Sequence, residues 1–136
     1  MADLSITAAN VVADSVSKQE YTAGATITAG QALYIDTANN NVAKLAQADG
    51  TALEATVKGI ALNGASSGQP VLVAVSGTLD LGATLTVAAV YIVSATAGGI
   101  CPVDDLASSS YLSIIGVGTA ADQITLGILN SGVEKA

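Results

Sequence analysis

The stretch GATITAGQALYI at residues 24–35 returns with small changes as GATLTVAAVYI at residues 82–92. At an offset of 58 residues, the run Gly24, Ala25, Thr26 and Thr28 becomes Gly82, Ala83, Thr84 and Thr86. Two copies are too few for a solenoid, whose repeats each need stacked neighbours on both sides. The repeat therefore predicts one domain built from two similar β units.

The similarity continues beyond the first match. If one residue is dropped near Gly30, Tyr34 aligns with Tyr91 at an offset of 57, so we expect these two tyrosines to be equivalent core anchors. The predicted units are residues 24–77 and 82–132, preceded by residues 1–23 as an N-terminal arm or an extra strand. Further matches at this offset or with a shorter second loop are Val57, Gly59, Ile60, Gln69 and Gly77 with Ile114, Gly116, Val117, Gln123 and Gly132.

Short apolar runs with a period of two, separated by Gly, Asn and Ser clusters, are typical of β-strands joined by turns. Helical signals are weak and confined to residues 11–16 and 43–55. The pattern predicts an all-β protein, a single sandwich or barrel-like domain. The predicted strands are residues 30–35, 42–45, 52–62, 71–75 with a continuation to 81, 84–94, 111–117 and 124–129, with a hairpin turn at 36–41 and a turn-rich crossing at 96–105.

The composition is poor in large side chains. The 136 residues are 51% hydrophobic, but they include no Phe or Trp and only four Tyr. Because alanine contributes little free energy on burial, the core should be thin, and burial between subunits would add to it. We therefore expect a homo-oligomer, a trimer ahead of a dimer.

The charge balance excludes several partners. Four Lys, no Arg or His and eleven acidic residues give a formal net charge of −7. Binding of nucleic acid or of anionic lipid needs clustered cations, so neither partner is expected. No apolar run is long enough to span a membrane, and no basic segment precedes an apolar one near the start. We expect a chain without a signal peptide, made and folded in the cytoplasm.

The residues also offer little chemistry. Without histidine, neither Cys101 nor any serine has the usual base of a nucleophilic pair, and zinc lacks ligands. Two acidic residues, Asp80 and Glu54, are the candidates for a glycosidase pair, but sugar sites usually offer aromatic platforms that this chain lacks. The sequence predicts neither an enzyme nor a cofactor.

Two segments carry oxygen ligands that calcium prefers. One is Asp36 with residues 39–41, and the other is Asp104 with Asp105. Neither has the spacing of a helix–loop–helix calcium site. The simpler interpretations are a hairpin turn, in which Asn tolerates positive φ, and a solvated loop.

Four phrases together resemble a known family: MADLSITAANVV (residues 1–12), TAGATITAGQALY (22–34), VKGIALNGASSGQPVLV (57–73) and TAGGICPV (96–103). They are similar to small capsid decoration (cement) or head-fibre proteins of tailed bacteriophages. The resemblance implies a β protein of jelly-roll or tulip-like form on the virion surface that binds the major capsid protein and bridges its subunits as a homo-oligomer. It carries over no site residue. A receptor- or glycan-binding fibre or tail module and a calcium-stabilised β module remain as alternatives.

The N-terminal arm is the candidate contact of such a protein. Leu4 and Ile6 alternate and are followed by Val11 and Val12, a composition able to pair with an exposed strand edge. We expect these four residues to contact the major capsid protein or an adjacent decoration subunit. The alternative is that the segment is an edge strand of its own domain.

Overall fold

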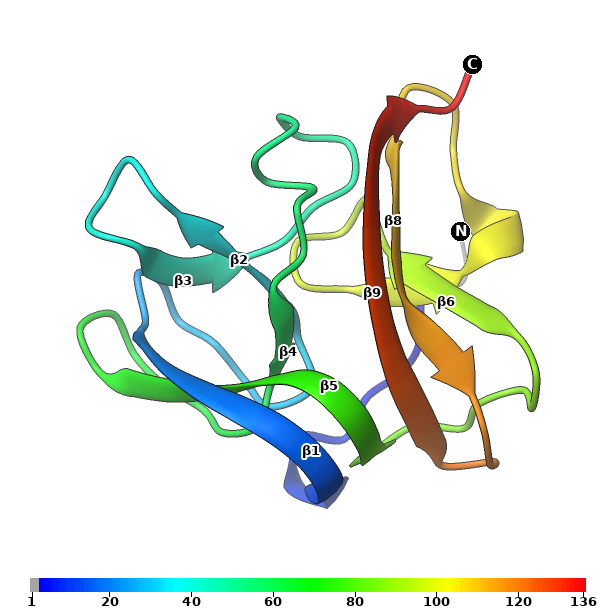
Figure 1. Cartoon of the computed structure of the whole chain (residues 1–136), viewed down its shortest axis with the longest axis horizontal. Helices are drawn as coiled ribbons and strands as arrows, with labels where there is room; N and C mark the ends of the chain where they lie inside the picture. The colour runs from blue at the N-terminus through cyan, green and yellow to red at the C-terminus, as the bar shows by residue number, and fades with distance from the viewer. Residues whose placement is uncertain (1–2) are drawn as a thin grey trace.

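Figure 1 shows the computed structural model, which describes residues 3–136 as one curled antiparallel sheet. The all-β prediction is confirmed, since the only helical elements are two 3-10 turns, η1 (Ala8–Asn10) and η2 (Val103–Asp105), within the described part of the chain. The strands are β1 (Val11–Thr22), β2 (Ala32–Asp36), β3 (Val42–Leu45), β4 (Gly59–Ala61), β5 (Pro70–Leu81), β6 (Val90–Val93), β7 (Ile100–Pro102), β8 (Tyr111–Gly118) and β9 (Gln123–Glu134).

The strand order is symmetric about the contact between β5 and β9. It runs β3-β2-β4-β5-β9-β8-β6-β7, so β2 to β5 of the first half occupy the places of β6 to β9 in the second half. One edge of β5 pairs with β1 along its whole length. The other edge is shared, because Val73 pairs with Ala61 of β4 and Leu79 pairs with Ile124 of β9. This is the arrangement that an internal duplication predicts.

Backbone hydrogen bonds recur in the two halves. The Gly30 N–H donates to the Ala61 carbonyl at 2.8 Å, and the Ala88 N–H donates to the Gly118 carbonyl at 2.7 Å. The same correspondence holds for the Ile27 N–H to Ala65, at 2.8 Å, and the Leu85 N–H to Ala121, at 2.7 Å. These pairs relate the halves at offsets close to those that the sequence shows.

Tyr34 and Tyr91 are both anchors of the main core, as expected, but their places in the backbone ladder differ by one residue. Leu33 pairs with Gly59, and Tyr91 pairs with Gly116, which corresponds to Gly59 in the second half. Tyr91 therefore occupies the place of Leu33. No residue is missing from the second turn, because Ala88 adopts a φ of +69° where Gly30 has a φ of +94°.

Replacing Ala88 by glycine should stabilise the protein. An L-residue in the left-handed region costs about 1–2 kcal/mol, and part of this gain is lost to the greater entropy of glycine in the unfolded chain. We expect a net gain of about 0.5–1 kcal/mol in the free energy of unfolding, measured by urea denaturation. The matched control is Ala52→Gly, at an exposed residue with ordinary φ, which should destabilise; equal effects at the two positions would contradict the explanation.

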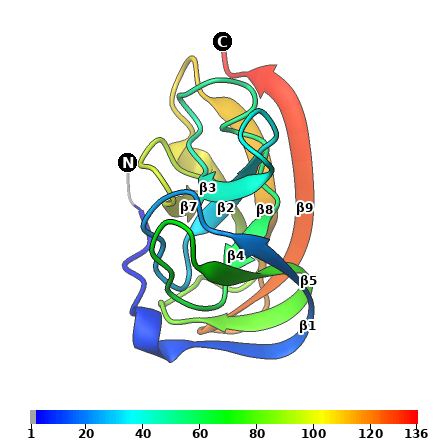
Figure 2. The same ribbon diagram turned by 90° about the vertical axis from the view of Figure 1, so that its left-hand side faces the viewer.

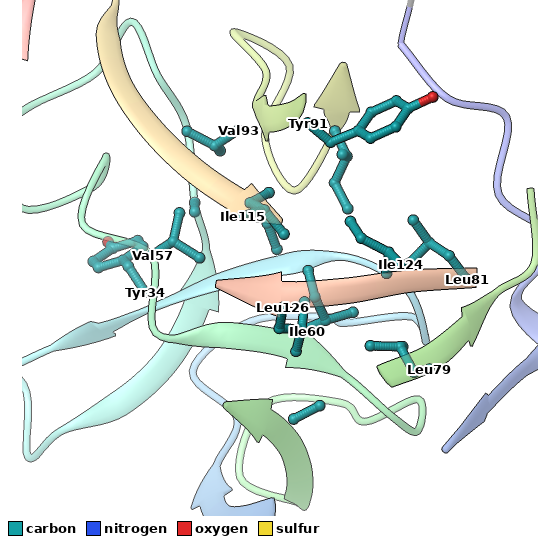
Figure 3. Close-up of a cluster of buried hydrophobic side chains, with 14 of the residues drawn as sticks. Tyr34, Val57, Ile60, Leu79, Leu81, Tyr91, Val93, Ile115, Ile124 and Leu126 are labelled. Atoms are coloured by element: carbon teal, nitrogen blue, oxygen red, sulfur yellow. The ribbon is translucent and has the colours of Figure 1, made fainter. Parts of the chain in front are cut away.

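The main core lies between the two halves of the curled sheet. Figure 3 shows branched aliphatic side chains of β4, β5, β8 and β9 meeting there, with the rings of Tyr34 and Tyr91 at opposite ends. Both tyrosines are buried, at 7% and 2% exposure. A second, smaller cluster, with Ile27, Leu33 and Val73 among its members, belongs to the first half alone. Small and branched side chains thus fill both clusters, as the composition predicts.

Several predicted strands are shorter than the sequence indicates. The strand expected at residues 52–62 covers only 59–61, because Thr51 and Glu54 close a turn: the Thr51 N–H donates to Glu54 Oε1 at 2.8 Å and the Glu54 N–H donates to Thr51 Oγ1 at 3.3 Å. The strand expected at 84–94 is reduced to β6. The turn-rich crossing at 96–105 contains β7 and η2.

Candidate interaction surface

The N-terminal segment is attached to its own domain. The Leu4 N–H donates to the Ile100 carbonyl and the Thr7 N–H to the Gly82 carbonyl, both at 2.8 Å. Leu4, Ile6 and Val11 pack against the main core. Three of the four predicted contact residues therefore face inward, because apolar side chains beside an incomplete core are buried by it first. The arm's first two residues lie outside the described part of the chain.

Val12 behaves differently, since its side chain is 53% exposed. It belongs to β1, which is the extra strand that the sequence left as an alternative and which replaces the weak helical signal at residues 11–16. Only Val11, Val16 and Tyr21 of this strand are half-buried, and its other residues are exposed. Within residues 3–136, β1 pairs with β5 and with no other strand, so its outer edge is open. Figure 2 shows β1 along the rim of the molecule.

The pairing of β1 with β5 resembles the pairing of β5 with β9. Thr22, the last residue of β1, lies opposite Pro70 at the start of β5. Asp80, near the end of β5, lies opposite Gln123 at the start of β9. The end of strand β1 thus pairs with the start of β5, as the end of β5 pairs with the start of β9.

A second surface lies on the outer face of β8 and β9. Leu129 lies opposite Ile114 in the ladder and is 62% exposed, and Val133 further along β9 is 63% exposed. Val117 of β8 is also exposed. These four residues form what we call the β8–β9 apolar face, which carries no charge until Glu134. Apolar side chains gathered on one sheet face are typical of a protein contact.

The total accessible surface of the chain is close to that expected for a compact monomer of its mass. It amounts to 6123 Å², whereas a monomer of 13.2 kDa is expected to have roughly 6,400 Å². The small side chains of the core therefore do not leave the monomer with unusually much exposed surface. An oligomer would have to form through particular surfaces such as the two just described.

Cys101 is unsuited to nucleophilic chemistry. It is fully buried in β7. Burial raises the pKa of its thiol to about 11, with smaller contributions from the carboxylates of Asp3 and Asp105. At neutral pH the side chain is a thiol, which is a poor nucleophile.

Asp36, the first calcium candidate, holds the β2–β3 hairpin together. Its Oδ2 accepts hydrogen bonds from Asn39 Nδ2 at 3.0 Å and from Lys44 Nζ at 2.9 Å, and its Oδ1 accepts from the Ala38 N–H at 3.2 Å. The hydrogen bond from Asn39, followed by that from Lys44, lowers the pKa of Asp36 below 3.8. The next two residues, Asn40 and Asn41, have φ of +59° and +58°, as expected for Asn in such a turn.

Acid should weaken this hairpin. Because the folded-state pKa of Asp36 is lowered, its carboxylate stabilises the fold above pH 3.8, and that stability is lost as the pH falls through the lowered pKa. Asp36→Asn should therefore melt below the wild type at pH 7, with the difference in Tm shrinking as the pH falls below 3.8 and through the lowered pKa of Asp36. Thermal unfolding across this range measures it. The exposed Asp104→Asn is the control, and a pH-independent difference for Asp36→Asn would contradict the role.

The other predicted acidic residues do not form one site. Asp104 and Asp105 lie in η2. Glu54 closes its turn with Thr51. Asp80 instead lines an open cavity of about 610 Å³ between the N-terminal segment and the start of the second unit, where Asp122 and hydroxyls of Ser5, Thr7 and Thr84 also lie. The structure does not bring Asp80 and Glu54, the candidates for a glycosidase pair, into one site, because Glu54 does not line this cavity.

Within residues 3–136, no group of three or more Cys, His, Asp or Glu side chains is placed to hold a metal ion. None of the helical segments there has the length and apolarity needed to cross a membrane. No known protein-family profile matches the chain, and a comparison with curated proteins gives no significant match.

Proposed function

We propose that this protein is a structural component of a phage virion that binds the outer surface of the capsid and stabilises it by bridging major capsid subunits. The observation that carries the proposal is the β8–β9 apolar face, an uncharged surface whose exposed side chains include Leu129 and Val133. Such a face suits a protein partner better than a sugar, a nucleic acid or a lipid headgroup. The resemblance of the sequence phrases to decoration proteins supports the major capsid protein as that partner.

The physical task of such a protein is simple. A ligand that binds the assembled shell, and not its separated subunits, stabilises the shell by mass action. Contacts that repeat over many copies add avidity. Both effects need a stable fold and a complementary surface, and neither needs chemistry at an active site.

The test is reconstitution on purified undecorated heads. The wild-type protein should co-sediment with the heads and raise their melting temperature. A Leu129→Asp/Val133→Asp double variant should lose most of this binding, because two buried charges would be left without partners. The matched control is Val87→Asp, which alters a side chain of 60% exposure on the loop before β6. Heads that bind the double variant as well as the wild type would refute the role of this face.

A receptor- or glycan-binding fibre module is the second candidate, and the open cavity beside Asp80 favours it, because hydroxyl and carboxylate groups line that cavity. None of the four tyrosines lines it, so a sugar ring would find no aromatic platform there. Binding on a glycan array that is lost in Asp80→Ala would favour this candidate over decoration.

A further inference from the structure

We propose that β1 joins two copies of this chain edge to edge, antiparallel, about a two-fold axis close to Val16. The partner is a second copy of the same strand. The inference concerns the isolated chain, so it stands whether or not the protein binds a capsid.

The open edge of β1 is the starting observation. The strand is 12 residues long, and inside the described part of the chain it pairs only with β5. Most of its side chains are exposed, so little besides the ladder to β5 holds it. An unpaired strand edge exposes N–H and C=O groups that another strand can satisfy.

The molecule itself shows what fits such an edge. The corresponding edge of β5 is covered by β1 in an antiparallel ladder from Val11 opposite Leu81 to Thr22 opposite Pro70. The pairing of β1 with β5 resembles that of β5 with β9. The outer edge of β1 therefore corresponds to the edge of β5 that β1 covers. The fitting occupant is a long antiparallel strand.

The charges of β1 select a second copy. The strand carries Asp14, Lys18 and Glu20, and Lys18 is the only lysine among the first 43 residues. Antiparallel pairing about Val16 places Lys18 of each copy opposite Asp14 of the other. Two chains of net charge −7 repel each other overall, so a contact between copies needs such local attraction.

The irregularities of β1 agree with the same axis. The ladder to β5 shifts between Ala13 and Ser15 and again between Ser17 and Lys18. The two shifts lie on either side of Val16, so a two-fold axis there brings each shift opposite the other. Such irregularities discourage pairing with a regular foreign strand. A two-fold contact predicts a dimer, in place of the trimer that the composition favoured.

Charge exchange tests the contact directly. Sedimentation of the full chain between about 1 and 200 µM should show a monomer–dimer equilibrium. Lys18→Asp and Asp14→Lys each place like charges opposite one another twice, and each should weaken dimerisation about tenfold or more. The double variant Asp14→Lys/Lys18→Asp should restore it. Lys135→Asp, which makes the same charge change at the exposed C-terminal end, should leave it unchanged.

A wild type that stays monomeric throughout this range overturns the proposal, as does a dimer that neither single variant weakens. If a variant fails to fold by circular dichroism, hydrogen exchange of the wild type gives an independent reading. Amide protection of residues 11–22 should rise with protein concentration, while that of the edge strand β3 stays constant; protection in β1 that ignores concentration overturns the proposal. Loss of head binding by a protein that still dimerises would count against the capsid role alone.

Discussion

Gly77→Ala is expected to leave the protein unfolded, or less stable by about 4 kcal/mol or more. Gly77 lies in β5 with a φ of +100°, a conformation that L-residues rarely adopt. A Cβ at this position would also collide with the Ser15 carbonyl and the Val16 backbone of β1. Ser15 and Val16 lie opposite Thr78 and Gly77 in the ladder to β5, so moving them away from the new Cβ would break hydrogen bonds of that ladder. The loss approaches the whole stability of an ordinary small domain.

Urea denaturation followed by circular dichroism measures this loss. Gly127→Ala is the matched control, since Gly127 lies in a strand at ordinary φ and an added Cβ would meet nothing within 4 Å. That variant should be as stable as the wild type, or more stable by about 0.5 kcal/mol. A Gly77→Ala protein as stable as the control would mean that β1 does not lie against β5 as described.

Tyr91→Ala should cost about 3–5 kcal/mol, the usual loss for truncating a buried aromatic residue. The side chain is 2% exposed and belongs to the main core. Its hydroxyl accepts a hydrogen bond from the Thr86 N–H at 2.8 Å. Tyr91→Phe keeps the ring but leaves that partly buried N–H without an acceptor, so it should cost about 1–2 kcal/mol.

The comparison of the two variants separates packing from hydrogen bonding. Tyr21→Phe serves as the control, because the Tyr21 hydroxyl donates to Gln19 Oε1 at 2.7 Å in an exposed place and its loss should change little. Chemical denaturation of the three variants measures the series. If Tyr91→Phe and Tyr91→Ala cost the same, the ring would contribute nothing to the core, which would contradict the burial described above.

The sequence was most informative where local chemistry decides the structure. The alternation of Val71 and Val73 places both in the smaller cluster. The segment DTANNN forms the expected hairpin because Asn40 and Asn41 accept positive φ at little cost. In such places the side chains alone determine the backbone conformation.

Prediction from the sequence failed where main-chain pairing with a distant segment determines the structure. Strand β1 has no apolar alternation, since only Val11, Val16 and Tyr21 are half-buried, and its main chain completes the ladder of β5. The shared residue type of Tyr34 and Tyr91 suggested a one-residue gap in the alignment. The two turns instead have the same length, and Ala88 adopts the positive φ that Gly30 has in the first half.

The predicted contact residues illustrate a related point, because three of the four also pack on their own core. Leu4, Ile6 and Val11 were chosen for their apolar character, and that same character draws them onto their own core. The part of this region that stays accessible is the side chain of Val12 and the outer edge of β1, which presents main-chain groups and charged side chains. Apolar patterning does not reveal such an edge, because every strand carries the same main chain.

The length of β8 determines at which end of the chain a further β unit could be added to the sheet. On the shared edge of β5, β4 occupies the first half and β9 the second. On the corresponding edge of β9, β8 occupies both, since its pairing runs from Gly118 opposite Ile124 to Tyr111 opposite Glu134. A third unit fused after residue 136 would find no vacant edge there, whereas one fused ahead of β1 would meet an open strand. A designed three-unit chain should therefore carry its extra unit ahead of β1, where the open strand edge would pair with it.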